Sequence, residues 1–139
     1  MSAGSGIAHS EFNASRTEPV HLLQIWIEPS SEGINPSYEQ GEVKTDPADT
    51  LPLIAGPRGS GAATTIHADA RVYAGVLKSG SRIELALGAG RGAWVQVIAG
   101  TIQVNGTSLH AGDAAAIEGE SFLNLLAETE AEVMLFDLA

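Results

Sequence analysis

The chain has 139 residues, enough for one domain with a substantial core and short for two. Seventeen acidic residues against seven basic ones give a formal charge of −10, which repels phosphate backbones and disfavours nucleic acid as a ligand. The absence of cysteine excludes disulfides, thiolate metal sites and cysteine nucleophiles, and no apolar run is long enough to span a membrane.

The first ten residues lack the basic region and the apolar run of a signal peptide, so we expect a cytoplasmic protein. Residues 20–27 (VHLLQIWI) are apolar almost throughout and lie between Pro19 and Pro29. Their many β-formers predict a strand, buried on both faces or lying at a domain junction. Proline and glycine then recur among acidic and small residues over 28–52, which predicts an irregular connector.

After Leu53 the sequence becomes a series of short apolar segments separated by glycine-rich breaks. Asn105-Gly106 between TIQV and TSLH predicts a two-residue hairpin, because a type I′ turn needs positive φ at both positions. No convincing amphipathic helix is present, and residues 122–132 alternate as a strand does. The expected strands are LPLIA, TTIHA, RVYAGVL, RIELAL, AWVQVIA, TIQVN, SLHAG, AAAIE, FLNLLAE and EVMLFDL.

This spacing predicts an all-β sandwich or small barrel over residues 51–139. Residues 1–50 are expected to form an arm that is not a domain by itself. The loop at residues 88–92 (GAGRG) looks like a phosphate-binding loop, but neither Lys-Ser nor Lys-Thr nor a helix follows it. We therefore expect it to connect two strands.

Several segments together resemble the pirin family of bicupins, which includes bacterial quercetin dioxygenases. In the first segment, GSGIAHSEFNAS, Gly6, His9 and Asn13 have the spacing of the second half of a cupin metal motif. The blocks EPVHLLQIWIEP, GINPSYEQ, AWVQVIAGTIQVNG and SLHAGDAAAIEG extend the likeness along nearly the whole chain. The resemblance implies a cupin-type double-stranded β-helix, a jelly-roll barrel, at residues 51–139. Residues 1–50 would be the remnant of an N-terminal cupin, followed by a junction strand and connector.

The resemblance also implies a metal half-site. Pirins hold their metal in the N-terminal cupin through an HxH pair, a later histidine and a glutamate, and His9 and Glu11 match the last two. The HxH pair would lie upstream of Met1, so we expect either that the reading frame starts late or that the chain is a fragment. A divalent transition metal (iron, nickel, copper or manganese) is the family's expected cofactor. Because two ligands rarely hold such an ion against water, we expect none to be tightly bound here.

Alignment of the later barrel with the cupin motifs puts residues without metal-donating side chains at all the ligand positions. Ala93 occupies the position of the glutamate, residues 86–89 span the HxH pair, and Phe122 occupies the position of the last histidine. We therefore expect this barrel to be filled by side chains.

The other candidate residues have structural interpretations. His21 is expected to be a half-buried strand residue, and His67 and His110, on separate strands, to be structural or exposed. Trp26 and Trp94 could stack on a flavonoid-like ligand, but core packing is the favoured prediction.

Three functions follow from the resemblance. The first is a structural or interaction module without independent catalysis. The second is a quercetin 2,3-dioxygenase-like enzyme whose metal site another chain completes, and the third is a regulator that binds a protein partner. Without a first cupin the HLLQIWI strand would be uncovered, so we expect a homodimer or higher assembly through residues 1–30.

Overall fold

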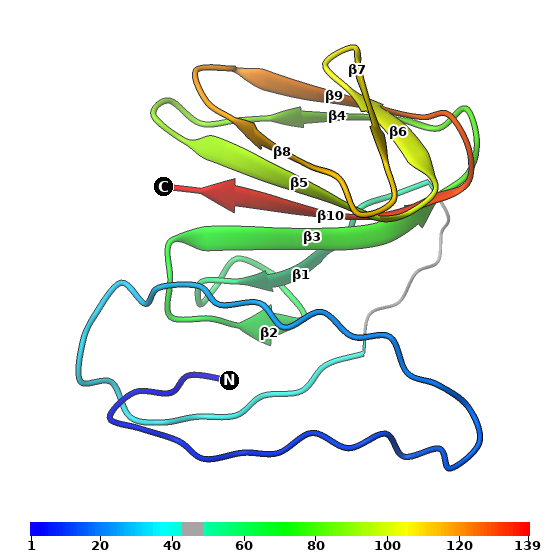
Figure 1. Ribbon diagram of the computed structural model, residues 1–139. Coiled ribbons are helices and arrows are strands. Elements are labelled where there is room, and N and C mark those ends of the chain that lie inside the picture. Colours follow the sequence, from blue (N-terminus) through cyan, green and yellow to red (C-terminus); the bar gives the residue numbers. More distant parts are fainter. Residues whose placement is uncertain (43–48) are drawn as a thin grey trace.

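The structure, a computed structural model, describes residues 1–42 and 49–139 and contains ten strands and no helix within them. Figure 1 shows the strands stacked as a curved two-layer body, with the N-terminal segment forming an open loop beside it. No helix of the described chain is long and apolar enough to cross a membrane. The strands are β1 (Leu53–Gly56), β2 (Thr64–Thr65), β3 (Ala70–Leu77), β4 (Arg82–Ala86), β5 (Gly92–Ala99), β6 (Thr101–Val104), β7 (Thr107–His110), β8 (Ala114–Ile117), β9 (Phe122–Ala127) and β10 (Ala131–Leu138).

The strands form a six-stranded sheet in the order β2-β1-β3-β10-β5-β8 and a four-stranded sheet in the order β4-β9-β6-β7. The long strand β10 lies between β3 and β5 and pairs antiparallel with both. Neighbours in the six-stranded sheet are mostly far apart in sequence, as expected for a jelly roll. The predicted all-β cupin barrel is confirmed, and each of its predicted segments contains a strand.

The main core lies between the two sheets. Along β9, Leu123, Leu125 and Ala127 are buried while Phe122 and Asn124 are exposed, which is the alternation of a strand with one face on a core. The strand β10 is instead buried along nearly its whole length, because both of its faces are covered. Its Val133 and Leu135 belong to the main core, and its Met134 and Phe136 belong to a smaller cluster on the outer face of the six-stranded sheet.

Two turns show how the sequence encodes the barrel. Asn105 and Gly106 have φ values of 47° and 85° and join β6 to β7, with Val104 opposite Thr107, which confirms the predicted hairpin. Gly100, between β5 and β6, has a φ of 79°, and a Cβ added there would lie 2.1 Å from the carbonyl oxygen of Glu130. A side chain is therefore excluded at this crossing by both the backbone conformation and the close neighbour.

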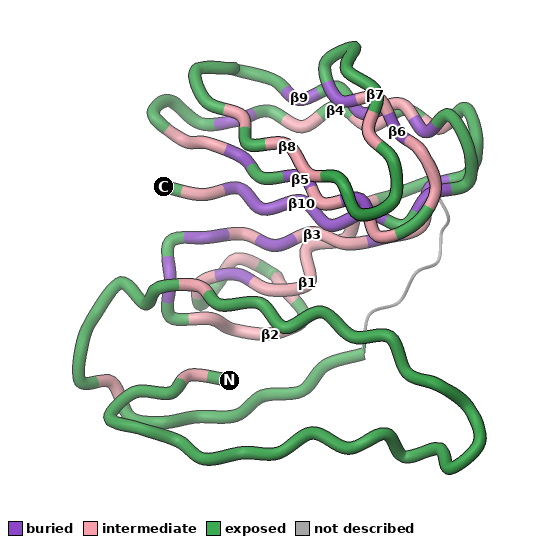
Figure 2. The backbone as a smooth tube through the Cα atoms, in the orientation of Figure 1, coloured by how far each residue is buried: buried purple, intermediate pink, exposed green. Residues whose placement is uncertain are grey.

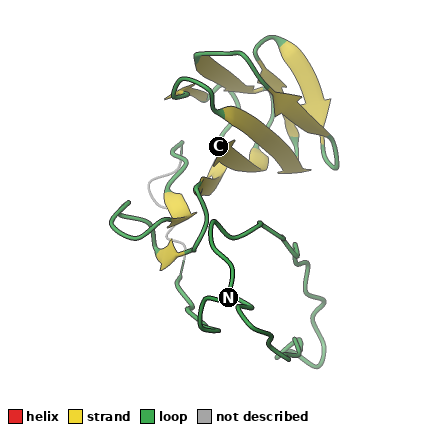
Figure 3. Ribbon diagram, turned by 90° about the vertical axis from the view of Figure 1, so that its left-hand side faces the viewer, coloured by secondary structure: helices red, strands yellow, loops and turns green. Residues whose placement is uncertain are grey.

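The arm, residues 1–50, contains no strand in its described part, and almost all of its residues are exposed (Figure 2). Viewed at right angles, it again projects away from the sheets as an open loop (Figure 3). Hydrogen bonds attach its described residues to the barrel at a few points: the Ser30 amide donates to the His67 carbonyl at 2.8 Å, and the Thr65 amide donates to Glu39 Oε2 at 2.7 Å. The Lys78 amide and the Ser81 hydroxyl both donate to Asp49 Oδ1. In addition, Ser2 Oγ lies 2.9 Å from His67 Nδ1.

The predicted strand at residues 20–27 is wrong. The segment contributes to no sheet, and its side chains are exposed except for Ile27, which is partly buried. A strand forms only where another strand satisfies its backbone groups, and none lies beside this segment among residues 1–42 and 49–139. The connector is irregular over residues 28–42 and 49–52 apart from one isolated bridge between Ser37 and Ser2, and the rest of it lies outside the described residues. The proposed division of domains at residue 50 stays a prediction.

Candidate functional site

The interior of the barrel is lined with hydrocarbon. Its buried core is made of Leu77, Leu87, Ala93, Val95, Val97, Ile102, Val104, Leu123, Leu125, Ala127, Ala131, Val133 and Leu135. None of these side chains carries a group that can donate to a metal or transfer a proton. The prediction that side chains fill this barrel is confirmed, and Ala93, at the expected glutamate position, is one of them.

Phe122, which the alignment puts at the position of the last cupin histidine, has a side chain that is 51% exposed and does not fill the barrel. Its neighbours on β9, Leu123 and Leu125, point inward instead. Since side chains alternate along a strand, an inward Leu123 forces Phe122 outward. Similarly, Ala86 on the paired strand β4 is exposed, while Leu87 is buried in the core.

The predicted metal residues, His9 and Glu11, lie close together on the arm. Nε2 of His9 is 3.8 Å from Oε1 of Glu11, and the two side chains are 39% and 57% exposed. An imidazole and a carboxylate are suitable donors for a divalent transition metal. However, no group of three or more potential ligands is gathered anywhere in the described chain. These two side chains therefore fit half of a metal site, without the burial and further donors that would hold an ion.

The remaining histidines lie apart from His9. His21 is exposed and outside any strand, so the prediction of a half-buried strand residue is wrong, because no strand of the described chain pairs with the segment that carries it. His67 is exposed and contacts Ser2, and His110 is exposed with its Nδ1 3.6 Å from Oδ2 of Asp113. The expectation that these two are structural or exposed is confirmed. The expected strand position is confirmed for His110 on β7 and wrong for His67, which lies after the end of β2 and outside any strand.

Both tryptophans are exposed, and the favoured prediction that they pack in the core is wrong. Trp26 is 88% exposed and Trp94 is 41% exposed. Trp94 lies on the outer face of β5, and Trp26 lies on the arm segment that crosses this face. Together they line a groove of about 480 Å³ whose walls also include Leu23, Ile25, Met134 and Phe136.

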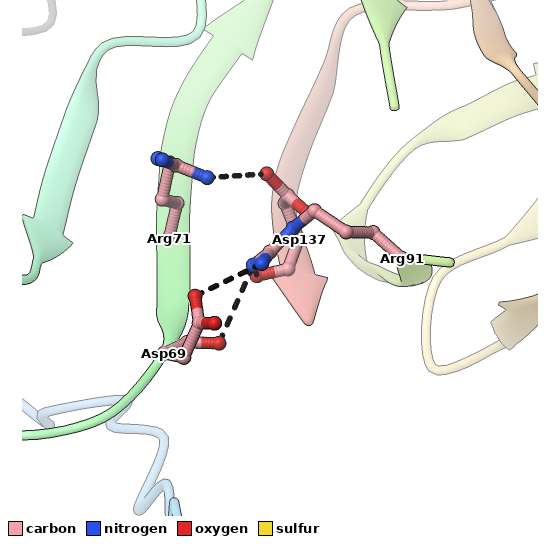
Figure 4. Close-up of polar contacts among 4 residues, drawn as sticks. All are labelled: Asp69, Arg71, Arg91 and Asp137. Carbon is pink, nitrogen blue, oxygen red and sulfur yellow. Dashed lines mark hydrogen bonds and ion pairs between the residues drawn. The ribbon is translucent and has the colours of Figure 1, made fainter. Parts of the chain in front are cut away.

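A cluster of ion pairs lies at one end of the six-stranded sheet and consists of Asp69, Arg71, Arg91 and Asp137 (Figure 4). The buried carboxylate of Asp137 on β10 accepts hydrogen bonds from Arg91 and from Arg71, and Arg91 also donates to Asp69 at 2.9 Å. The hydrogen bond to Asp137 raises the pKa of the Arg91 guanidinium; burial opposes this effect and Asp69 adds to it. Through Arg91 and Asp137, the cluster attaches the 88–92 loop to β10, and through Arg71 it attaches β10 to β3. The loop itself joins β4 to β5, so it connects two strands as expected.

Sequence reasoning missed this cluster. The available signal was Asp137 itself, the one charged residue in the otherwise apolar run VMLFDL at residues 133–138. A buried carboxylate needs a cationic partner, and such partners come from elsewhere in the chain. Because both arginines are occupied by carboxylates in the same cluster, its role is to hold strands together.

Comparison with known proteins places these features in a family. A family model described as the quercetinase C-terminal cupin domain matches residues 53–138, and a model described as pirin matches residues 1–27. The chain is 38% identical to a quercetin 2,3-dioxygenase from Escherichia coli K12 over 138 residues. It is 39% identical to a pirin-like protein from Caulobacter vibrioides over 141 residues. These alignments cover 99% and 100% of this chain but 59% and 60% of the relatives, so the chain spans about three fifths of their length.

Solved structures agree with these relatives. The crystal structure of YhhW from Escherichia coli matches with a TM-score of 0.75 and 31% identity, over 82% of this chain and 48% of that one. A second structure, bacterial pirin YhhW in complex with nickel(II), matches with a TM-score of 0.72 and 29% identity, over 79% of this chain and 47% of that one. Together with the apolar jelly-roll barrel, these matches show that the chain belongs to the pirin family of cupin proteins.

Proposed function

We propose that this chain acts as a structural and interaction module of a pirin-type protein and carries no catalysis of its own. The observation that supports this proposal is the composition of the barrel interior, where Leu77, Ile102, Leu123 and Leu135 are at most 1% exposed. A metal-dependent reaction needs donor atoms and room for a substrate. Here hydrocarbon occupies the space that a cupin would use for both.

His9 and Glu11 support a second candidate, a metal-dependent oxidoreductase whose site another chain completes. Two of the relatives described above bear on it, because one is named quercetin 2,3-dioxygenase and another was crystallised with nickel(II). When bound, an iron, nickel, copper or manganese ion would supply Lewis-acid and oxygen chemistry. The neutral imidazole of His9 and the carboxylate of Glu11 would each donate one lone pair. On their own they leave such an ion mostly hydrated, so this chain alone supports no metal-dependent step.

Metal analysis of the protein, purified without added metal, tests the proposal. We expect strongly substoichiometric iron, nickel, copper, manganese and zinc, with contents that His9→Ala leaves unchanged. His110→Ala is the matched control, because His110 also lies beside a carboxylate on the surface, at 3.6 Å from Asp113. A nearly stoichiometric ion that is lost in His9→Ala and retained in His110→Ala would refute the module and support the enzyme.

A further inference from the structure

We propose that Asn105, at the tip of the β6–β7 hairpin, is a site of spontaneous deamidation, and that its contact with β9 sets the rate of the reaction. This inference goes beyond the proposed function and does not depend on it. It rests on three observations: the residue that follows Asn105, the exposure of the turn, and the hydrogen bonds that hold the Asn105 side chain.

The sequence favours the reaction at this residue. The chain has four asparagines, and only Asn105 is followed by glycine. The others, Asn13, Asn35 and Asn124, are followed by alanine, proline and leucine. Deamidation begins when the backbone nitrogen of the next residue loses its proton and attacks the side-chain carbonyl carbon. Glycine has no Cβ to obstruct this attack, whereas a larger side chain hinders it and proline has no amide proton to lose.

The reaction needs water and no other reactant. The Gly106 nitrogen forms a bond to Cγ of Asn105, which closes a succinimide ring, and the side-chain nitrogen leaves as ammonia. Water then adds to one of the two ring carbonyls and reopens the ring. Aspartate results when the bond between the Gly106 nitrogen and Cγ breaks, and isoaspartate results when the original peptide bond breaks. The net change is the gain of a water molecule and the loss of an ammonia molecule, without oxidation or reduction.

The attacking nitrogen is open to solvent. Asn105 and Gly106 are both exposed, and a Cβ built on Gly106 meets no atom within 4 Å. Within the described chain the Gly106 amide has no hydrogen-bond partner, because the turn lies beyond the last pair of the ladder, Val104 and Thr107. This nitrogen can therefore lose its proton to water without breaking a hydrogen bond.

The side chain of Asn105, in contrast, is restrained. Its Oδ1 accepts a hydrogen bond from the Asn124 amide at 2.8 Å, and its Nδ2 donates to the Phe122 carbonyl at 3.4 Å. The backbone amide of Asn105 also donates to the Asn124 carbonyl at 2.9 Å. Both partners lie on β9, so the carboxamide is held against the neighbouring strand. Because attack requires Cγ to turn toward the Gly106 nitrogen, the carboxamide must first leave these partners.

The opening that releases Asn105 can be local. Among the described strands, β7 lies at an edge of the four-stranded sheet and pairs only with β6 (Figure 1). The hairpin can therefore lift from β9 while β4 and β9 stay paired. Peripheral elements open at a lower free energy than the core does, so we expect hairpin opening to admit the reaction without global unfolding.

The products weaken the same contact. Aspartate at position 105 has no Nδ2 donor and places a carboxylate oxygen near the Phe122 carbonyl. Isoaspartate adds a methylene group to the backbone of the turn, which shifts Val104 relative to Thr107. Deamidated chains should therefore hold the hairpin on β9 less firmly than unmodified chains.

Peptide mass spectrometry tests the restraint. Folded chain and chain unfolded in urea are incubated at the same temperature and mildly alkaline pH, and the aspartate and isoaspartate formed at position 105 are measured over time. We expect deamidation to be at least about tenfold slower in the folded chain, because hydrogen bonds must break before the reaction. Equal rates in the two states, or no deamidation in either, would refute the proposal.

Gly106→Ala tests the identity of the attacking group. In the unfolded chain, where the backbone conformation of the turn has no influence, the added methyl group should slow the reaction by obstructing the nitrogen. An unchanged rate would show that the Gly106 nitrogen is not the attacking group.

A matched pair of variants tests whether the hairpin opens by itself. Leu109 on β7 and Leu85 on β4 are both partly buried and pack against the main core from opposite edges of the four-stranded sheet. Leu109→Ala should speed deamidation of the folded chain severalfold, whereas Leu85→Ala should leave the rate close to that of the wild type. Equal rates in the two variants, whether raised or unchanged, would overturn the role given to the hairpin. Metal content, which tests the proposed function, is measured independently of these rates.

Discussion

The barrel and the arm both contain long apolar segments, yet only the barrel folds them into sheets. In the barrel, β10 is flanked by β3 and β5, which satisfy its backbone, and its side chains are buried on both faces. Residues 20–27 of the arm are as apolar as β10 but have no neighbouring strand, so they remain extended and exposed. The difference shows that an apolar run becomes a strand only where another strand lies within hydrogen-bonding distance.

The same two regions divide the requirements of a metal site between them. The barrel offers an interior shielded from water, but its side chains carry no donor atoms. The arm offers the donors His9 and Glu11, but both are open to solvent. Tight binding of a transition metal needs donors and an enclosing structure together, and in neither region do the described residues combine the two.

The largest contrast between the regions is expected in stability. Leu135→Ala removes a fully buried side chain from the main core and should lower the free energy of unfolding by about 2–5 kcal/mol. Phe12→Ala removes a side chain that is 87% exposed on the arm and should change it by less than about 0.5 kcal/mol. Urea denaturation followed by circular dichroism measures both. A substantial loss in Phe12→Ala would mean that the arm packs on the barrel more than its exposure indicates.

A smaller effect separates two glycines of the barrel with the same backbone conformation. Gly106→Ala should cost about 1 kcal/mol, because φ is 85° there but a Cβ meets no atom within 4 Å. Gly100→Ala should cost about 3 kcal/mol, because its Cβ would also collide with the carbonyl oxygen of Glu130. The difference between the two unfolding midpoints isolates the collision. Equal losses would show that the turn between β9 and β10, which carries Glu130, moves away from Gly100 easily.

The smallest expected effect concerns the surface of the barrel. Glu128 accepts hydrogen bonds from Ser108 and Gln103, which lower the pKa of its carboxyl below 4.5. Because the folded-state pKa is depressed, this contact stabilises the fold above the unfolded pKa, and the stabilisation is lost as pH falls through the folded pKa. An NMR titration should show Ser108→Ala moving the Glu128 midpoint upward.

Ser81→Ala is the control for that titration. The Ser81 hydroxyl donates to Asp49 and lowers the pKa of that carboxyl, so its loss should raise the midpoint of Asp49 and leave Glu128 unchanged. If the Glu128 midpoint moved equally in both variants, the cause would be a general change in the electrostatic potential around the barrel, and the contact with Ser108 would not be specific.

The barrel could be predicted from sequence to a large extent. Alternating apolar residues and glycine-rich breaks located every strand, and Asn105-Gly106 located a hairpin, because these signals act between residues close together in the chain. The alignment of Phe122 with the last cupin histidine did not by itself fix the direction of its side chain. A motif alignment counts residues, whereas the inward or outward direction of a side chain depends on the register of the whole strand, and Leu123 takes the inward position.

The sequence by itself determined an all-β sandwich or small barrel after Leu51, because composition and short-range pattern carry that information. The resemblance to pirins added the jelly-roll topology, the interior without metal ligands and the two donors on the arm, His9 and Glu11. Only the tertiary structure decided that residues 20–27 lack a partner, that Trp26 and Trp94 face a groove, and that Arg91 and Asp137 meet across the sheet. Each of these depends on which distant segments become neighbours, and burial and strand pairing are properties of those neighbours rather than of any segment alone.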